Sequence, residues 1–219
     1  MGMLPDGNSL PAWLFDLCDT DSPESKKTLE IANNTLTAAL RGEPGPNTSV
    51  SLLSKVPMAA ATLGRSEAVR YLIPNQLRAL PGRRDSPTRP NMIMPNRMSL
   101  REGVQATDAE APGRAAEALH LALLQSKPLI HVFPAWPNDW DAEFLLLARG
   151  NFLVRSSIQR GKVLNVELES KSGTECRLRN PWGDVEVVLK RAGKTESLRG
   201  PILQFPTTKG EKVVVSLVE

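Results

Sequence analysis

The chain has 219 residues, 41% of them hydrophobic and 23% charged, and a formal net charge of +3 at pH 7. This balance excludes wholesale disorder, and the length suffices for one large or two small domains. The sequence has no run of the roughly 18 apolar residues that a membrane-spanning helix needs. Its N-terminal segment lacks the basic start of a signal peptide, so we expect a soluble protein with no export signal and no membrane partner.

The cysteines and histidines indicate no metal chemistry. Cys18 and Cys176 lie in different halves of the chain without a motif spacing, so they predict neither a disulfide framework nor a metal site. His120 and His131 have no ligand partner at metal spacing, and we expect packed or surface side chains. A glycine-rich phosphate loop and a nucleophile elbow are also missing, so we predict no metal and no cofactor.

Residues 1–46 are predicted to be an irregular extension that carries one helix. Ser22 followed by Pro23 marks the helix start, because a hydroxyl caps the first turn and proline suits the first helical position. Gly42 and Pro44 are expected to stop the helix. The apolar positions recur at helical spacing and are Leu29, Ala32, Leu36 and Leu40.

Residues 47–127 are predicted to form a partial helical array, like part of a helical barrel. Asn47 or Thr48 is expected to cap a second helix, which Pro57 interrupts. Ser66 is expected to open a third helix, which Pro74 disturbs in the same way.

A fourth helix is expected from Pro112 to Gln125. Small residues in its apolar stripe favour close packing against a neighbour. The stripe consists of Ala115, Ala118, Leu119, Ala122 and Leu123.

Residues 80–105, between the third and fourth helices, are predicted to be a long loop rich in arginine and proline. The window 78–101 holds six arginines and one acidic residue, Asp85, which is compatible with binding of phosphate or an anionic polymer. It lacks the interleaved aromatic residues of a single-strand binder and every groove-reading motif. We therefore favour a solvated loop and predict no nucleic-acid partner.

From Leu129 onward the hydrophobic pattern has a period of two, which indicates β-strands. Turn signals recur about every ten residues, at Arg160-Gly161, Ser172-Gly173, Gly183-Asp184, Ala192-Gly193 and Lys209-Gly210. This spacing predicts a small antiparallel β-sandwich over residues 128–219. The predicted class is α+β. The alternating apolar residues are Leu164, Val166 and Leu168, then Cys176 and Leu178, then Val185, Val187 and Leu189, and finally Val213, Val215 and Leu217.

Four stretches, in this order, resemble a known family. They are Ala116-Glu117-Ala118-Leu119 with Leu123-Leu124-Gln125-Ser126, then IHVFPAWP from Ile130 to Pro137, then Arg149-Gly150-Asn151-Phe152, and CRLRNPW from Cys176 to Trp182. The chain thereby resembles the C-terminal part of glycoside hydrolase family 95, the α-L-fucosidase group and its relatives. The similarity is good over 95–190, weaker over 47–95 and absent over 1–46. It implies the last helices of an (α/α)6 barrel, here a remnant of that toroid, followed by a β-sandwich domain.

The resemblance also implies a chemistry, the hydrolysis of a fucosidic or galactosidic bond with inversion. Inversion needs an acid and a base, whose carboxyl groups stand about 6.5–9.5 Å apart to admit a water molecule. The family places its base just before the fourth helix, in a Q-x-D-G-N-F-G segment. Counting back from Gln125 puts Glu110 at that position, and Asp108 is the alternative after a shift of two residues. Neither residue is followed by Gly-Asn-Phe-Gly, and we favour the interpretation that both are the acidic first turn of the helix.

The resemblance leaves enzyme activity uncertain. An (α/α)6 barrel takes twelve helices, of which we predict about four, and the family's acid lies in upstream sequence without a counterpart here. A single carboxylate cannot supply both proton transfers, so we expect a truncated, carbohydrate-related region that is not catalytic alone. Its expected partners are a carbohydrate and the missing upstream part of the barrel. Proteins of this family are often secreted or periplasmic, so the localisation stays open.

Trp136 and Trp140 flank Pro137-Asn138-Asp139 and are the candidate substrate-binding residues. Indole faces beside an amide and a carboxylate suit a sugar, whereas two aromatic rings also clamp a strand-to-loop junction onto a core, and we favour the latter. Two alternatives to a barrel-sealing domain stay open. One is a stand-alone carbohydrate-binding module that uses these tryptophans, and the other is a basic interaction module that uses residues 78–101.

Overall fold

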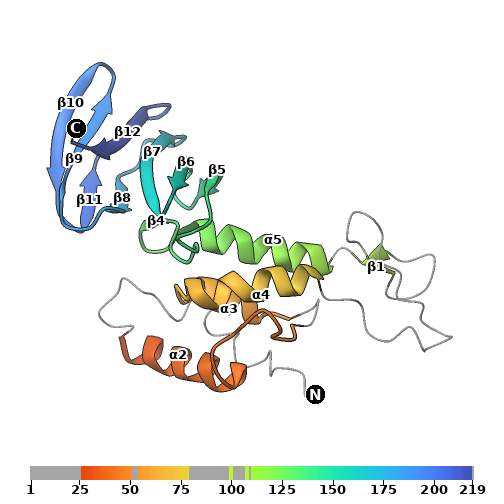
Figure 1. Ribbon diagram of the computed structural model, residues 1–219. Coiled ribbons are helices and arrows are strands. Elements are labelled where there is room, and N and C mark those ends of the chain that lie inside the picture. The colour runs from red at the N-terminus through yellow and green to blue at the C-terminus, as the bar shows by residue number, and fades with distance from the viewer. Residues whose placement is uncertain (1–25, 51–53, 79–98, 101–106, 109, 219) are drawn as a thin grey trace. The chain divides into compact units, whose positions relative to one another are not determined.

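A computed structural model of the chain describes residues 26–50, 54–78, 99–100, 107–108 and 110–218 (Figure 1). The chain divides into two compact units, Met1–Ala122 and Leu123–Glu219. Helices dominate the first unit and strands the second, so the predicted α+β class with a β-sandwich is confirmed. Within the described residues, none of the helices has the length and apolar character that crossing a bilayer requires.

The helical unit begins, in its described part, with α2 (Lys26–Leu40), whose buried residue is Leu36. This helix confirms the periodicity seen in the sequence, although Ser22 and Pro23 lie outside the described residues. The chain leaves the helix through Arg41 and Gly42, which both have positive φ angles, 56° and 126°. Helices commonly end with a residue of positive φ after the last turn, and glycine adopts this conformation without strain.

Helices α3 (Val56–Thr62) and α4 (Ser66–Arg78) form a helical hairpin with a small-residue core. All but the last residue of α3 are buried, and three of them are consecutive alanines. Gly64, with φ 71°, connects the two helices. Two backbone hydrogen bonds close the end of α3, from the Arg65 N–H to the Ala60 carbonyl at 2.9 Å and from the Gly64 N–H to the Ala61 carbonyl at 3.1 Å. This pattern is a Schellman cap, which satisfies the last carbonyls of α3.

Two prolines behave differently from the sequence prediction. The second helix does not start at Asn47 or Thr48 with Pro57 as an interruption; it starts at Val56, and Pro57 occupies its first turn. Proline fits there because the first N–H groups of a helix have no intrahelical acceptor. Helix α4 continues through Pro74 to Arg78.

Tertiary hydrogen bonds hold the part of α4 that follows Pro74. The Asn75 amide nitrogen donates to the carbonyls of Gly45 and Thr48 at 3.1 and 3.0 Å. The Gln76 amide nitrogen, which is buried, donates to the Ser54 carbonyl at 2.8 Å. These contacts anchor the last turn to the preceding loop, which offsets the missing N–H group of Pro74.

Helix α5 (Glu110–Leu123) confirms the fourth predicted helix but ends earlier than expected. Ala115, Ala118 and Ala122 are fully buried on one stripe of the helix, as the spacing predicts. Gln125 belongs to strand β3 (Leu124–Ser126) and not to the helix. The change from helix to strand therefore takes place without a connecting loop.

Two short strands lie near the predicted loop. β1 (Ser99–Leu100) falls inside the segment 80–105 and pairs antiparallel with β2 (Thr107–Asp108). Residues 79–98 and 101–106, which include most of the arginines, lie outside the described residues.

The second unit consists of two sheets. A four-stranded sheet has the order β11-β8-β4-β3, and a six-stranded sheet has the order β10-β9-β12-β7-β6-β5. All neighbours are antiparallel except β4 and β8, which run parallel. The strands after β3 are β4 (Ile130–Val132), β5 (Ala142–Ala148), β6 (Phe152–Gln159), β7 (Lys162–Ser170), β8 (Cys176–Arg179), β9 (Glu186–Arg191), β10 (Lys194–Arg199), β11 (Ile202–Phe205) and β12 (Lys212–Leu217).

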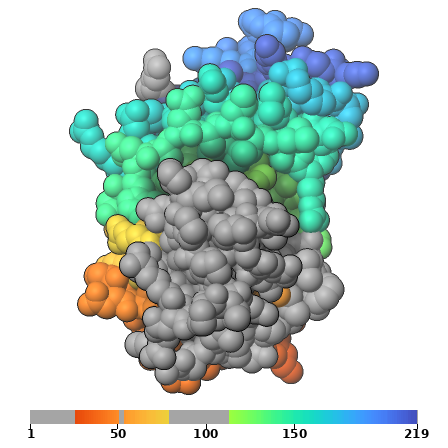
Figure 2. All heavy atoms as spheres, turned by 90° about the vertical axis from the view of Figure 1, so that its right-hand side faces the viewer, coloured from red at the N-terminus to blue at the C-terminus, as the bar shows by residue number. Residues whose placement is uncertain are grey.

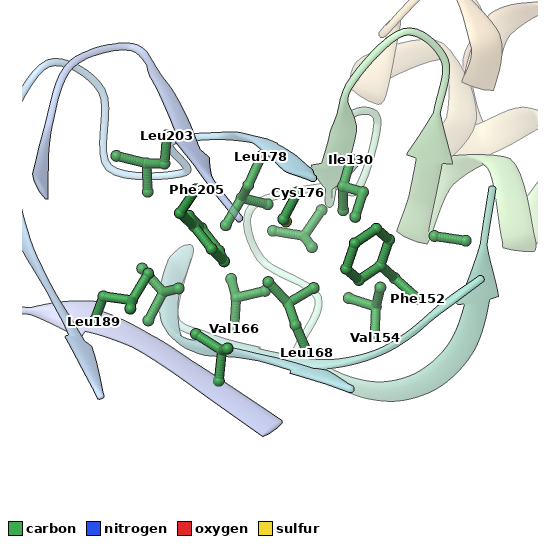
Figure 3. Close-up of a cluster of buried hydrophobic side chains, with 14 of the residues drawn as sticks. Ile130, Phe152, Val154, Val166, Leu168, Cys176, Leu178, Leu189, Leu203 and Phe205 are labelled. Atoms are coloured by element: carbon green, nitrogen blue, oxygen red, sulfur yellow. The ribbon is translucent and has the colours of Figure 1, made fainter. Parts of the chain in front are cut away.

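The hydrophobic core lies between these sheets (Figure 3). Phe152 and Val154 of β6 and Val166 and Leu168 of β7 point toward Leu178 and its neighbours in the opposite sheet. Alternation explains this, because every second residue of a strand faces the same side. The buried residues that complete the core include Ile130, Val132, Cys176, Val187, Leu189, Leu203, Phe205, Val213 and Val215.

Three positions of the predicted alternation are not buried. Leu164 is 48% exposed because a β-bulge at Ser157/Ile158 pairs Ile158 with Val163, which leaves Leu164 out of the register. Val185 precedes the first residue of β9 and is 40% exposed. Leu217 is the last residue of β12 and is 44% exposed.

The predicted hairpin turns are confirmed where two residues join neighbouring strands. Arg160 and Gly161 link β6 to β7 with φ angles of 47° and 73°, and Ala192 and Gly193 link β9 to β10 with 45° and 75°. Two consecutive positive φ angles define the hairpin turn whose twist matches that of the strands. These turns fix the register of both hairpins.

Gly173 lies in a turn after β7 that packs closely against another segment of the backbone. A methyl group there would lie 2.7 Å from the backbone nitrogen of Lys209, whereas one at Gly193 would meet nothing within 4 Å, and both glycines have φ near 75°. We predict that Gly173→Ala lowers the free energy of unfolding by about 3 kcal/mol and Gly193→Ala by about 1 kcal/mol. Urea unfolding followed by tryptophan fluorescence measures both, and equal losses would contradict this explanation.

Candidate functional site

The candidate sugar-binding loop, residues 133–141, connects β4 to β5. Phe133 starts the loop with a positive φ of 54°, and its N–H donates to the Leu123 carbonyl at 2.7 Å. Its ring meets that of Phe144 edge to face with centroids 5.2 Å apart. The aromatic contact anchors the start of the loop to the core of the sheet unit.

Trp136 and Trp140 lie against each other within this loop. Their ring centroids are 5.3 Å apart at an interplanar angle of 78°, and the Trp136 indole N–H donates to the Trp140 carbonyl at 2.8 Å. Both side chains are half-buried, and the intervening Asn138 and Asp139 are exposed. The pair therefore holds the loop together from within, and whether it serves packing or sugar binding stays a prediction.

The far end of the loop is fixed to the hairpin turn between β6 and β7. An Asp141 side-chain oxygen accepts the backbone N–H of Arg160 at 2.7 Å. Gly161 lies so near that a methyl group there would be 3.1 Å from the Asn138 carbonyl oxygen. Both ends of the loop are thus held by the sheet unit, which restricts the positions of the exposed amide and carboxylate.

The acidic candidates lie in the other unit. Asp108 is the second residue of β2, where it pairs with Ser99, and Glu110 is the first residue of α5. The start of a helix is the place where a carboxylate interacts favourably with the helix dipole, as the simpler interpretation of Glu110 states. A catalytic role for either residue stays a prediction.

Among the described residues, no cluster of three or more histidine, cysteine or carboxylate side chains is arranged to hold a metal ion. Cys176 is fully buried in the sheet core, and burial raises the pKa of its thiol to about 12. A neutral thiol in such a place packs as a small apolar side chain. Cys18 lies outside the described residues.

Asn180 organises a corner that sequence reasoning missed. Its amide nitrogen donates to the carbonyls of Val185 and Gly200, both at 3.0 Å, and its side-chain oxygen accepts the Trp182 backbone N–H at 3.1 Å. The Trp182 indole N–H donates to the Val163 carbonyl at 2.9 Å, and the ring packs against the core. Trp182 therefore fills this corner of the sandwich, and the Asn-Pro-Trp sequence of residues 180–182 is the local signal that could have revealed it.

His131 is a half-buried histidine in β4, a strand that lies between β3, where Gln125 is its partner, and the parallel strand β8. Its Nδ1 atom is buried without a hydrogen-bond partner among the described residues. Burial disfavours the charged imidazolium and lowers its pKa to about 4. His131 is thus a packed histidine, which agrees with the expectation from the sequence.

Comparison with known protein families finds a similarity that lies in the sheet unit. Residues 125–215 match the model described as glycoside hydrolase family 95, C-terminal domain. The matched segment begins within β3 and ends within β12, so it spans nearly the whole sandwich. The resemblance to the C-terminal part of this family is confirmed for this segment, and helices precede it along the chain. No curated protein matches the chain.

The low pKa of His131 predicts a pH-dependent stability. The unfolded chain takes up a proton near pH 6.5 and the folded one near pH 4, so the free energy of unfolding falls as the pH drops through this window. The full loss is about 3 kcal/mol. We expect urea unfolding at several pH values to show this slope for the natural chain but not for His131→Gln.

His120→Gln is the matched control for this measurement, because His120 is exposed on α5. It should leave the slope between pH 6.5 and 4 unchanged. A slope that survives in His131→Gln would show that other groups cause it.

Proposed function

We propose that this chain is a family 95-like, carbohydrate-related region whose sandwich has a structural role, and that it does not hydrolyse glycosides by itself. The observation that supports the proposal is the coincidence of the family match, residues 125–215, with the sheet unit. That unit encloses a continuous apolar core, and its main polar interactions hold loops and corners. Such a domain suits the sealing of one end of a helical barrel.

The helical unit supports the same conclusion. The described part of the chain holds four helices, α2 to α5, and an (α/α)6 barrel needs twelve. Four helices are too few to close the wall of such a barrel, and inversion needs two carboxyl groups with separate roles. Asp108 or Glu110 would at most supply the base. We propose that the natural partner of the sandwich is the remaining helical part of such a barrel, and that the chain is a truncated form of this architecture.

One carboxylate of the sheet unit, Glu169, is a poor candidate for the acid of such a reaction. The pKa of Glu169 is lowered, chiefly by the hydrogen bond from the Lys171 ammonium group at 2.6 Å. A general acid in a glycoside hydrolase needs the opposite shift, because it must stay protonated until it donates. Glu169 is therefore unsuited to act as that acid.

The proposal predicts no enzyme-like turnover of nitrophenyl fucosides or galactosides by the purified full chain. Release of nitrophenol in an absorbance assay measures the activity, and the same assay is run on Asp108→Asn and Glu110→Gln. The natural chain and both variants should equal the background. Turnover that either variant abolishes would disprove the proposal and identify the base.

A second candidate function, sugar binding by the tryptophan pair, is favoured by one observation. Trp136 and Trp140 are only half-buried, and the residues between them, Asn138 and Asp139, are exposed. Aromatic faces stack on the apolar face of a sugar, and an amide with a carboxylate can bind its hydroxyl groups. The basic-module alternative concerns residues that lie mostly outside the described ones, so it stays a prediction.

Tryptophan fluorescence during titration with fucose and galactose separates the two candidates. A structural sandwich should give a flat titration in the natural chain, whereas a sugar-binding one should show saturable quenching. Trp140→Phe should abolish any such quenching. Trp182→Phe is the control, because its indole is bound to the Val163 carbonyl at another corner of the sandwich and should leave quenching unchanged.

A further inference from the structure

The three exceptions to the predicted alternation, Leu164, Val185 and Leu217, share a location in the sheet unit. Leu164 lies on β7, Leu217 is the last residue of β12, and Val185 directly precedes β9. These strands are neighbours in the six-stranded sheet, in the order β9-β12-β7. Figure 2 shows the C-terminal part of the chain, coloured dark blue, at the surface of the sheet unit.

The strand registers bring the three residues together at one end of the sheet. Leu217 pairs with Val187 of β9, and Val185 lies two residues before Val187 in the chain. β12 also pairs with β7 as far as Val215, and the same antiparallel register continued by two residues sets Leu217 level with Leu164. Leu217 therefore lies in the middle, with Leu164 on one side and Val185 on the other.

The smaller sheet leaves this end of the larger one uncovered. Its strands have three or four residues, whereas β7 has nine and β12 has six. Leu217 follows the buried residues Val213 and Val215 in the alternation of β12, so it lies on the core-facing side of the sheet and is still 44% exposed. We call Leu164, Val185 and Leu217 the apolar shelf. Exposed apolar side chains that adjoin one another and have a polar border are typical of an interaction surface.

Exposed charges of opposite sign border the apolar shelf. Arg160 and Lys162 adjoin its β7 side, and Asp184 and Glu186 adjoin its β9 side. Among the described residues, Lys162 and Glu186 form no ion pair, and the Asp184 carboxylate lies 3.9 Å from the Arg199 guanidinium. A partner for this surface therefore needs acidic groups on one side of an apolar centre and basic groups on the other. A second copy of the chain, turned by half a revolution, has this arrangement.

We propose that two copies of this chain associate through the apolar shelf, about a two-fold axis close to Leu217. Because β12 lies between β9 and β7, this axis sets the β7 side of each copy against the β9 side of the other. Leu164 then faces Val185 twice. Lys162 likewise faces Glu186 twice, which adds a favourable charge pair on each side of the centre.

The symmetry and the size of the shelf define the kind of assembly. A two-fold contact between identical surfaces closes on itself, which makes a dimer and not a filament. Three partly exposed aliphatic side chains form a small centre compared with the roughly 800 Å² that each partner buries in a standard interface. The dimer is therefore weak and dissociates on dilution.

Sedimentation velocity of the full chain over a range of concentrations tests the proposal. Lys162→Glu and Glu186→Lys should each raise the dissociation constant of the dimer about tenfold or more, because each sets two pairs of like charges face to face. An equimolar mixture of the two variants should dimerise like the natural chain, because both charge pairs re-form with the signs exchanged. Both residues are exposed, so neither substitution disturbs the core.

Leu217→Lys tests the apolar centre independently of the charge pairs, and it should weaken the dimer by a similar factor. Leu147→Lys is the matched control, because Leu147 is 58% exposed on the outer strand β5, near the opposite end of the sheet. It should leave the dimer unchanged. Circular dichroism melting verifies that each variant is folded. A chain that stays monomeric at all concentrations, a mixture that does not restore dimerisation, or equal effects of the two leucine variants would overturn the proposal.

Discussion

The sandwich depends on one constraint, which is that alternate residues of ten strands must reach a single apolar interior from two sides. The six-stranded sheet contributes side chains such as Val154, Val166 and Leu189, and the smaller sheet closes over them with Leu178 and Leu203. The loops are arranged around this closure. Asn180 donates to the carbonyls of Val185 and Gly200 at one corner, and the edge-to-face tryptophans hold the loop between β4 and β5 at another.

Much of this architecture could be predicted because the signals are local. The glycines of the hairpin turns need positive φ angles, and the strands between them alternate with a period of two. The exceptions depend on partners distant in the sequence. Leu164 is exposed because of a bulge that pairing with β6 creates, and α4 continues past Pro74 because Asn75 and Gln76 find acceptors 22 to 30 residues earlier.

The candidate site could be predicted in part for the same reason. Trp136 and Trp140 are four residues apart, so the sequence could predict that they lie close together. It left open whether the pair serves packing or sugar binding. The role of Asn180 was hidden because its acceptors lie 5 and 20 residues away. The sequence predicted that Asp108 and Glu110 lie at or near the start of a helix. It could not show whether either is catalytic, because an inverting reaction needs a second carboxyl group across a cleft.

The parallel pairing of β4 with β8 has a consequence for how the domain is made. Ile130, near the start of the unit, is registered against Leu178, and β8 in turn pairs with β11 at residues 202–205. During synthesis, the first strands to leave the ribosome must therefore wait for segments that arrive dozens of residues later. Such non-local contacts make for slow folding and for a long exposure of unpaired strands to chaperones. Proteolytic cleavage between β7 and β8 would for the same reason dismantle the smaller sheet, although most hairpins of the larger one would still be intact.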